Sequence, residues 1–298
     1  MSRLLDAPGG GLTYAAAGVS LADGDDAVSR IAPIASATAR EGVVAGVGGF
    51  AGLFAPPARY ADPLLVASAD GVGTKLEVAR RLGRFDAIGV DLVAMLVDDL
   101  VCSGAEPLFV LDYVAVGRLD PARVAAVVSG VAEGCALAGA ALLGGETAEH
   151  PDTMEPDAID LAGFAVGVVE RARVLGPERV RAGDRLLGLP SPGLRSNGYS
   201  LARRAFAGRP LEGPAWDGAD VTLGEELLRP SVIYAPTVLA LLADLGLGVH
   251  AAAHVTGGGI VGNVARILGP GLDAAIDLDA FATPEIFFEV QRAGRVSA

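Results

Sequence analysis

The stretch DAIGVDLVAMLVDDLVCSGAEPLFVLDYVAVG, residues 86–117, decides the fold of this chain. Its first part, 86–104, is apolar at most positions and contains no proline, which predicts a long helix that is buried on most sides. Its second part, 107–117, is rich in Val, Leu, Phe and Tyr, which predicts a buried strand. A helix that leads directly into a strand is typical of α/β and α+β domains.

The segments on either side continue this alternation up to about residue 170. The expected strands are 63–71, 107–117, 140–145 and 160–169, and the expected helices are 25–40, 74–83, 86–104 and 120–139. Asp120 and Pro121 are typical of a helix start, and Gly83 is typical of a helix end. The charged segment 170–184 contains Gly and Pro and indicates a boundary between two domains, 1–170 and 171–298.

The second half repeats the pattern. The expected strands are 184–190, 249–255 and 273–278, and the expected helices are 196–206, 234–246, 256–269 and 284–294. Because strands and helices alternate throughout, the sequence predicts a two-domain protein of the α/β or α+β class.

Composition excludes several kinds of partner. The chain has 298 residues and a formal net charge of −13, and it shows no basic cluster with interleaved aromatic residues, so nucleic acid is not expected as a partner. No uncharged apolar run reaches the roughly 18 residues that span a bilayer. The first residues lack the long apolar stretch of a secretory signal. Cys102 and Cys135 lie in apolar, helix-like stretches, which favours buried reduced thiols and a cytoplasmic protein.

The turn SADGVGTKLEVA, residues 68–79, holds Lys75, the only lysine among 23 Lys and Arg residues. It is not a Walker A loop, because Thr74 precedes the lysine. Asp70 would repel a phosphate but can bind a hard cation, whereas the backbone amides of 71–74 and Lys75 can face phosphates directly. The mixture favours a magnesium–nucleotide complex. The alternative is an ordinary strand-to-helix turn capped by Thr74.

Two acids on the helix at 86–104 extend this hypothesis. Asp91 and Asp98 are seven residues apart and therefore share one helix face to within roughly 20°. Taken alone, they favour a narrow solvated stripe. Together with Asp70 they form a candidate Mg²⁺ site. Asp99 points about 100° away from Asp98 and is expected to serve structure.

Three further turns contain groups that can bind a substrate. GGETAEH (144–150) follows an apolar strand and offers backbone amides, a carboxylate and a hydroxyl. GLRSNGYS (193–200) and HVTGGG (254–259) precede expected helices, whose N-termini attract anions. Ser196 and Asn197 are equally well explained as helix caps. His254, at a strand end beside a glycine turn, is a candidate acid, base or substrate contact.

These segments occur in an order and spacing that resemble a known enzyme family. They are YAAAGVSLADGDDAV, GGFAGLF, DGVGTKL, GVDLVAMLVDDLVCSGAEPLFVLDY, GVAEGCALAGAALLGGETAEH, DLAGFAVGVVE, SNGYSLAR and AHVTGGG. Together they are similar to the phosphoribosylformylglycinamidine cyclo-ligases, also called aminoimidazole ribonucleotide (AIR) synthetases, and the resemblance runs from about Tyr14 to Val296.

The resemblance implies a two-domain AIR-synthetase-like fold with a ferredoxin-like, dimerising N-terminal domain and a C-terminal α/β domain. It implies a homodimer that uses ATP and Mg²⁺ and acts on formylglycinamidine ribonucleotide. In the family's reaction, the γ-phosphate activates the formyl amide oxygen and an internal nitrogen closes the imidazole ring.

The resemblance also implies roles for particular residues. Those expected to bind ATP are Asp70, Gly71, Gly73, Thr74 and Lys75, with Gly48, Gly49 and Phe50 as a covering loop. Those expected to bind substrate are Gly145, Glu146, Thr147, Ser196, Asn197, Gly198, Thr256, Gly257 and Gly258. His254, Lys75 and Asp91 are the expected catalytic residues, and Asp70, Asp91 and Asp98 the expected metal ligands.

The chain departs from the family at four positions. Ala32 replaces a frequent lysine, Ala69 a threonine, Arg195 a histidine and Asp98 an asparagine. The sequence ends before the family's E-M…F-N-x-G-x-G segment, which predicts a shortened C-terminal domain. A nucleotide-binding dimer with impaired catalysis is therefore one alternative. Another is a selenophosphate synthetase-like or thiamine phosphate kinase-like enzyme, although no cysteine precedes Cys102 to act as the reactive residue of the former.

Overall fold

A four-stranded mixed sheet forms the centre of the protein, for which a computed structural model describes residues 12–296. The strands are β3 (Pro63–Gly71), β4 (Glu106–Val116), β5 (Ala141–Glu149) and β6 (Ile159–Glu170), and their spatial order is β3-β6-β4-β5. Strand β6 is antiparallel to both of its neighbours, whereas β4 and β5 are parallel. A parallel pair requires a crossover, and the helix between β4 and β5 provides it.

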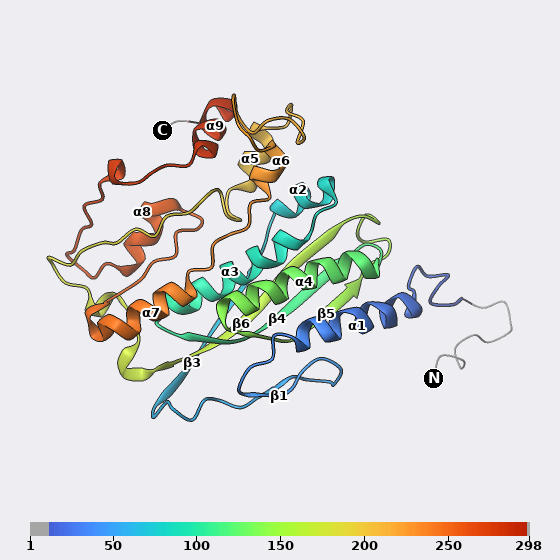
Figure 1. Ribbon diagram of the computed structural model, residues 1–298, viewed down its shortest axis with the longest axis horizontal. Helices are drawn as coiled ribbons and strands as arrows, with labels where there is room; N and C mark the ends of the chain where they lie inside the picture. The colour runs from blue at the N-terminus through green and yellow to red at the C-terminus, as the bar shows by residue number, and fades with distance from the viewer. Residues whose placement is uncertain (1–11, 297–298) are drawn as a thin grey trace.

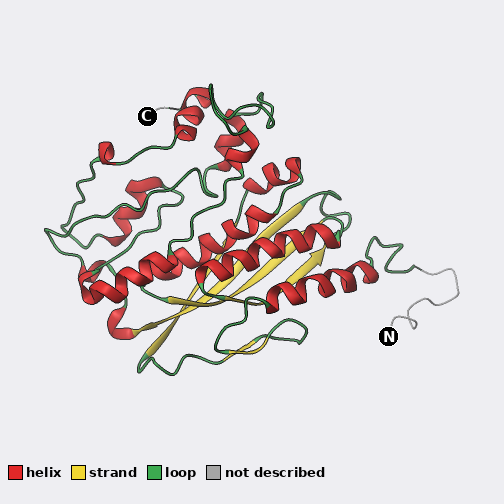
Figure 2. Ribbon diagram, in the orientation of Figure 1, coloured by secondary structure: helices red, strands yellow, loops and turns green. Residues whose placement is uncertain are grey.

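Helices cover one face of this sheet (Figures 1 and 2). They are α1 (Leu21–Ser36), α3 (Asp86–Cys102) and α4 (Pro121–Ala138), with the short α2 (Lys75–Leu82) beyond the end of β3. Helix α3 packs on β3 and β6, and α4 lies between α3 and α1. The close approach of α3 and α4 requires glycine, because a Cβ at Gly89 would overlap the backbone nitrogen of Val131. This layered α+β arrangement agrees with the predicted class.

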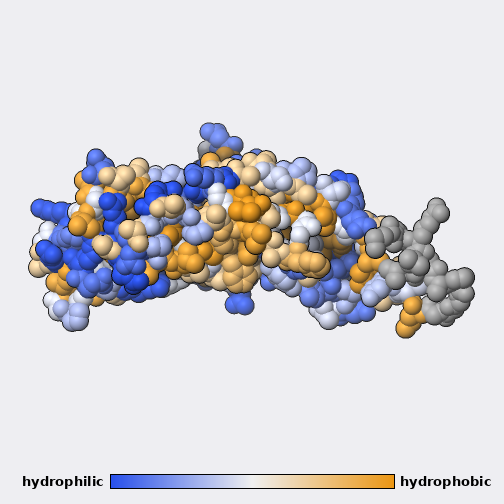
Figure 3. All heavy atoms as spheres, turned by 90° about the horizontal axis from the view of Figure 1, so that it is seen from below, coloured by the Kyte–Doolittle hydropathy of each residue, from blue (hydrophilic) through white to orange (hydrophobic). Residues whose placement is uncertain are grey.

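The other face of the sheet is not covered by any helix in the described residues. Side chains that alternate along three strands point away from the helices, and large apolar ones among them are exposed: Leu65 (69%), Tyr113 (36%) and Phe164 (53%). The view from below shows apolar surface in the middle of the molecule between more hydrophilic regions (Figure 3). Large apolar side chains that are exposed on one face of a sheet are typical of an interaction site.

A small hairpin lies beside the sheet. Strands β1 (Val43–Ala45) and β2 (Leu53–Phe54) pair antiparallel, and the glycine-rich loop 46–52 connects them. Phe50 at its tip is fully exposed. The loop lies next to β5, because Gly52 approaches the side chain of Leu143 on that strand.

The second half contains short helices joined by extended segments. They are α5 (Tyr199–Ala205), α6 (Leu223–Leu227), α7 (Ala235–Leu245), α8 (Gly259–Val264) and α9 (Glu285–Gly294), with single 3₁₀ turns at 171–173, 177–179, 246–248, 265–267 and 278–280. The strands predicted at 184–190, 249–255 and 273–278 are wrong, because these segments pair with no other strand in residues 12–296. A local pattern does not supply the partner that a strand requires.

Local signals in the first half are confirmed. Helix α2 ends at Gly83, which has a φ of 63°, and the Asp120 carboxylate accepts hydrogen bonds from the first backbone amides of α4. One prediction is corrected: residues 144–149 are not a loop, because β5 continues through them. Both cysteines are free thiols. Helix α4 is long and apolar enough to cross a membrane, but half of it is buried against the rest of the protein, which is typical of a core helix.

Candidate functional site

Lys75 and Asp91 form a buried ion pair between α2 and α3. The Nζ atom lies 2.6 Å from Oδ2 of Asp91, and neither side chain is exposed. The same Nζ donates hydrogen bonds to the carbonyl oxygens of Arg195 (3.0 Å) and Arg229 (2.8 Å). Because an ammonium group has three donors, none is left for a phosphate. The expected direct contact of Lys75 with a phosphate is therefore corrected: in this structure the lysine ties two helices to the second half of the chain.

The surroundings of Asp91 explain how a carboxylate is held there. Its Oδ1 accepts hydrogen bonds from the backbone N–H (2.8 Å) and the hydroxyl (2.6 Å) of Ser231. Burial raises the pKa of Asp91 and lowers the pKa of Lys75, and the attraction between the two opposes both shifts. A buried pair of this kind is maintained only where hydrogen bonds complete it, and here they do.

Asp98 lies two turns further along α3 and has a similar partner. Its Oδ2 accepts a hydrogen bond from the Arg195 guanidinium at 2.9 Å, and its Oδ1 accepts one from the backbone N–H of Tyr234 at 2.8 Å. Burial raises the pKa of Asp98, and the Arg195 charge acts in the opposite direction. The seven-residue spacing thus does place Asp91 and Asp98 on one face, but that face is buried and not a solvated stripe.

His254 joins the same group of side chains. Its Nδ1 lies 2.9 Å from Oδ1 of Asp99, and its Nε2 lies 3.3 Å from the Arg195 guanidinium. Asp99, expected to serve structure, therefore orients the imidazole. We call Lys75, Asp91, Asp98, Asp99, Arg195 and His254 the α3 charge cluster. Arg195 connects most of its members, through its guanidinium and its carbonyl oxygen.

The acids expected to bind magnesium do not form a ligand set. Asp91 and Asp98 are engaged by Lys75 and Arg195, and the Oδ1 of Asp70 accepts the backbone N–H of Gly71 at 2.7 Å. Across residues 12–296, no three His, Cys, Asp or Glu side chains are arranged to hold a metal ion. These residues therefore do not fit a resident Mg²⁺, and no chemical step is assigned to one.

The turn after β3 is accessible at its tip. Gly73 and Thr74 are exposed, Gly73 has a φ of 65°, and Gly71 ends β3. The hydroxyl of Thr74 does not cap α2 but lies 3.2 Å from the Ser200 hydroxyl at the start of α5. The turn and the N-terminus of α5 are thus neighbours.

A glycine in a left-handed conformation precedes both α5 and α8, and no side chain caps either helix. Gly198 precedes α5 with a φ of 80°, so neither Ser196 nor Asn197 caps this helix. Ser196 is buried, and the Asn197 amide contacts the sulfur of Met95 at 3.6 Å. Gly258 precedes α8 with a φ of 93°; Thr256 and Gly257 come just before it, and the amide of Asn263 donates to their carbonyl oxygens.

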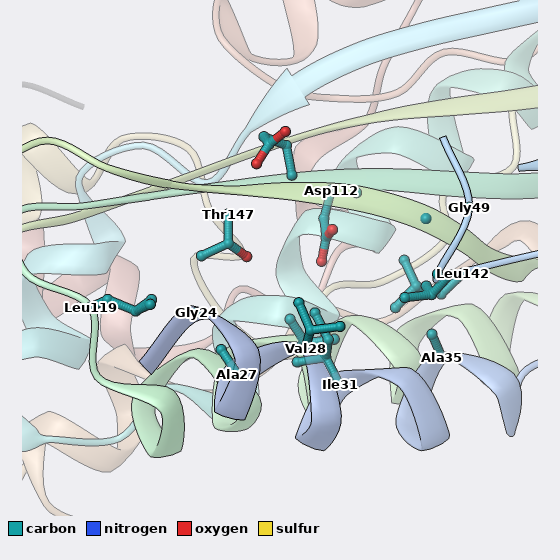
Figure 4. A pocket seen from close by; sticks show the side chains of 16 residues that line it. Gly24, Ala27, Val28, Ile31, Ala35, Gly49, Asp112, Leu119, Leu142 and Thr147 are labelled. Atoms are coloured by element: carbon teal, nitrogen blue, oxygen red, sulfur yellow. The ribbon is translucent and has the colours of Figure 1, made fainter. Parts of the chain in front are cut away.

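A cavity of about 380 Å³ lies apart from the charge cluster, between α1, the 46–52 loop and β5. It is lined by Gly24, Ala27, Val28, Ile31, Ala35, Val47, Gly48, Gly49, Asp112, Leu119, Val128, Leu142, Gly144, Gly145, Glu146 and Thr147. Two expected groups therefore meet here: Gly48 and Gly49 of the covering loop, and Gly145, Glu146 and Thr147. Figure 4 shows Asp112 and Thr147 pointing from the sheet toward α1.

Asp112 is the functional candidate that the sequence reasoning missed. It lies on β4 with its side chain almost fully buried, and its Oδ2 has no hydrogen-bond partner. Burial raises the pKa of Asp112 to about 7. An unpaired acid with a shifted pKa inside a cavity is typical of functional sites. The sequence did contain a signal for this site, namely an Asp within a segment that is predicted to be a buried strand. Burying a carboxylate costs free energy, so an acid at such a position indicates a special role.

Comparison with known proteins defines the class. Residues 54–169 match the family described as AIR synthase related protein, N-terminal domain, and residues 181–295 match its C-terminal domain. A solved structure of thiamine-monophosphate kinase from Stenotrophomonas maltophilia K279a is similar, with 25% identity, a TM-score of 0.51, and coverage of 73% of this chain and 64% of that one. The chain is thus an AIR synthase related protein of two domains.

The curated relatives identify the family more narrowly. The phosphoribosylformylglycinamidine cyclo-ligases of Xanthomonas oryzae pv. oryzae and Xanthomonas campestris pv. campestris are each 48% identical over 288 residues, which cover 96% of this chain and 84% of theirs. The chain therefore belongs to the phosphoribosylformylglycinamidine cyclo-ligase family.

Proposed function

We propose that this chain is an ATP-dependent cyclo-ligase of purine biosynthesis. It converts formylglycinamidine ribonucleotide and ATP to aminoimidazole ribonucleotide, ADP and phosphate. The observation that carries the proposal is the 48% identity to enzymes of that name over 96% of the chain. The proposed location is the cytoplasm, and Mg²⁺ is proposed to enter with ATP as its counter-ion.

The chemistry requires the formyl amide oxygen to leave. An amide oxygen is a poor leaving group, and transfer of the γ-phosphoryl group of ATP to it produces a good one. The amidine nitrogen then attacks the formyl carbon, the oxygen departs as phosphate, and the five-membered ring closes. The protein's task is to hold two flexible substrates in line and to exclude water.

We assign the two substrates to the accessible elements around the sheet. The exposed turn at Gly73 and Thr74, with the backbone amides before α5, is proposed to face phosphates, since amides at helix starts bind anions. Gly48, Gly49 and Phe50 are proposed to close over ATP as a loop. The α3 charge cluster lies behind the turn at Gly73, and within it His254 is proposed to face the reacting centre.

The uncovered sheet face supports the proposed homodimer. Leu65, Tyr113 and Phe164 point away from the helices and are exposed in the single chain. Packing the same face of a second copy against them removes apolar surface from water in a two-fold, self-complementary interface. The proposal is a dimer formed through the first domain.

A coupled assay of ADP release tests the function. Formylglycinamidine ribonucleotide should start ADP release, and omission of this ribonucleotide should abolish it. The same protein is also given thiamine monophosphate, the substrate that the name of the similar kinase indicates. Tight binding of ATP without release of ADP would favour the catalytically impaired form, and ADP release only with thiamine monophosphate would refute the cyclo-ligase assignment.

A further inference from the structure

The contacts of His254 decide which of its two ring nitrogens carries a proton. Nδ1 lies 2.9 Å from a carboxylate oxygen of Asp99, and Nε2 lies 3.3 Å from the guanidinium group of Arg195. A carboxylate can only accept a hydrogen bond, and a guanidinium can only donate one. Both contacts are hydrogen bonds only when Nδ1 is protonated and Nε2 is not. The geometry therefore selects one neutral form of the imidazole.

Arg195 is held firmly enough to impose this form. Its Nη2 donates to Oδ2 of Asp98 at 2.9 Å, and its Nη1 donates to the carbonyl oxygen of Val232 at 3.0 Å. The guanidinium also lies over the ring of Tyr234, 5.0 Å from its centroid, and only 10% of the arginine side chain is exposed. Arginine presents its donors in a rigid planar fork. The N–H that faces His254 is thus fixed in place.

The backbone of Arg195 shows independently that its position is fixed. Its φ of 56° is sparsely populated by residues with a Cβ, and such a conformation persists only where the surrounding structure determines it. The carbonyl oxygen at this bend accepts a hydrogen bond from Lys75. One residue thereby anchors its main chain on the buried Lys75–Asp91 pair and directs its side chain to Asp98 and His254.

The charges around the imidazole oppose one another. The Asp99 carboxylate favours the cationic imidazolium, whereas the Arg195 guanidinium disfavours it because like charges repel. The Cys102 thiol contacts the same backbone segment and has Arg266 as a further charged neighbour, and burial raises its pKa to about 12, so it stays neutral. Without Arg195, the imidazole would face Asp99 while the nearby Asp98 lost its counter-charge. Arg195 is therefore the group that opposes protonation at Nε2.

We propose that Arg195 is a positioning residue that keeps His254 neutral, with its proton on Nδ1, so that His254 serves the reaction as an acceptor at Nε2. The inference rests on the proposed function. When the amidine nitrogen bonds to the formyl carbon, it must release a proton, and the electron pair of the carbon–oxygen bond leaves with the phosphate. An unprotonated Nε2 can take that proton, whereas an imidazolium cannot.

A substrate can reach Nε2 without displacing Arg195 from the site. The contact between the guanidinium and Nε2 is 3.3 Å long, against about 2.9 Å for a typical N–H hydrogen bond, so it is weak. Nη2 keeps its 2.9 Å bond to Asp98 while a substrate N–H replaces it at Nε2. After proton transfer, Asp99 stabilises the imidazolium, and the guanidinium favours release of the proton to water, which restores the neutral form.

Nitrogen NMR of the chain without substrate tests the inference, because the two neutral forms of imidazole and the imidazolium differ in their nitrogen chemical shifts. The chain has three histidines, and the signals that disappear in His254→Gln identify the relevant ring. At about pH 7.5 the wild-type protein should show a protonated Nδ1 and an unprotonated Nε2. Arg195→Leu should raise the ratio of molecules with and without a proton on Nε2 about tenfold. Arg195→Lys, which also offers only donors, should keep the wild-type pattern.

Arg209 provides the matched control. Like Arg195, it pairs with a carboxylate (Glu289), donates to backbone carbonyl oxygens and lies over an aromatic ring (Phe206). Its partners are a different group of residues. Arg209→Leu should therefore lower stability in urea as Arg195→Leu does, yet leave the signals of His254 unchanged. A merely structural role of Arg195 would make the two variants alike in both measurements.

Asp99→Leu separates the two neighbours of the imidazole. Asp99 is about half exposed, so this variant keeps the fold. Nε2 should stay unprotonated in it, because Arg195 remains. The coupled ADP assay adds a kinetic measurement: Arg195→Leu should lower kcat several-fold and leave the KM for formylglycinamidine ribonucleotide nearly unchanged, and Arg195→Lys should restore most of the kcat.

Three results would overturn the inference: a proton on Nε2 in the wild-type protein, a wild-type pattern in Arg195→Leu, or transfer of the proton to Nε2 in Asp99→Leu. The first and third decide the matter even if Arg195→Leu does not fold. Because the NMR measurement needs no substrate, it is independent of the proposed function. The predicted nitrogen pattern without any ADP release would refute the cyclo-ligase assignment and leave the effect of Arg195 on His254 standing.

Discussion

The ammonium group of Lys75 is 2.6 Å from the carboxylate of Asp91, and both side chains are closed off from solvent. This pair joins the turn after β3 to the middle of α3, and through the carbonyl oxygens of Arg195 and Arg229 it reaches the second half of the chain. It therefore positions the elements around the proposed phosphate-binding turn, although Lys75 itself has no donor left for a ligand.

Breaking this pair from one side should be costly. Lys75→Met keeps much of the side-chain volume but leaves Asp91 buried without its counter-charge, so the free energy of unfolding should fall by about 3–5 kcal/mol. The double variant Lys75→Met/Asp91→Leu removes both charges and should recover a substantial part of the loss. Urea denaturation of the wild-type protein, Lys75→Met, Asp91→Leu and the double variant completes the cycle. A double variant less stable than Lys75→Met would contradict the prediction.

The stability of the protein should depend on pH through Asp112. Burial raises the pKa of this side chain from 3.8 to about 7 in the folded chain. Between these values the unfolded chain has lost the proton and the folded chain retains it, so stability falls as pH rises and the loss is complete above about pH 7. Roughly three pKa units correspond to about 4 kcal/mol.

Asp112→Asn removes this dependence. The variant should be more stable than the wild-type protein at pH 8 and should lose that advantage by pH 4, as measured by urea denaturation at both pH values. The titratable neighbours Glu146 and Cys135 are present in both proteins. Burial, and to a lesser extent the Asp112 charge, raises the pKa of the Cys135 thiol, so this thiol stays neutral between pH 4 and pH 8. An equal stability difference at the two pH values would show that Asp112 does not titrate in this range.

The first half of the fold could be predicted from the sequence because its signals are local. The apolar run of α3, the Asp120 cap of α4 and the glycine that ends α2 all act within a few residues. The extended segments of the second half have the residue pattern of strands but belong to no sheet in the described residues. A strand needs a partner strand that is distant in sequence, and a local pattern does not show whether that partner is present.

In the candidate site, too, local features could be predicted from the sequence and contacts between distant residues could not. The spacing of Asp91 and Asp98 correctly places them on one helix face, but their partners Lys75 and Arg195 are distant in sequence, so the metal hypothesis followed from residue types alone. Asp112 lies beside Gly145 because of the register in which β4 and β5 pair. The turn motifs in the sequence contain no information about this register. Sequence located most of the polar residues, and tertiary structure decided which of them meet.

The oligomeric state can be tested at the uncovered sheet face. Phe164→Asp places a charge in the middle of the proposed interface, where burying it without a partner is unfavourable, so sedimentation velocity should show a monomer. Leu247→Asp is the control, because Leu247 is also exposed but lies on the 3₁₀ turn after α7, away from the sheet. The wild-type protein and the control should sediment as dimers. A monomeric wild-type protein, or a dimer that persists in Phe164→Asp, would refute this interface.

The backbone at Arg195 should be strained. Its φ of 56° is in the left-handed region, which costs a residue with a Cβ about 1–2 kcal/mol. Arg195→Ala and Arg195→Gly both lose the contacts to Asp98 and His254, so their difference isolates the backbone. We expect the glycine variant to be the more stable by about 1 kcal/mol. At Arg204, inside α5, the order should reverse, because alanine favours a helix over glycine. Urea denaturation of the four variants gives both differences, and the same order at the two positions would mean that Arg195 is not strained.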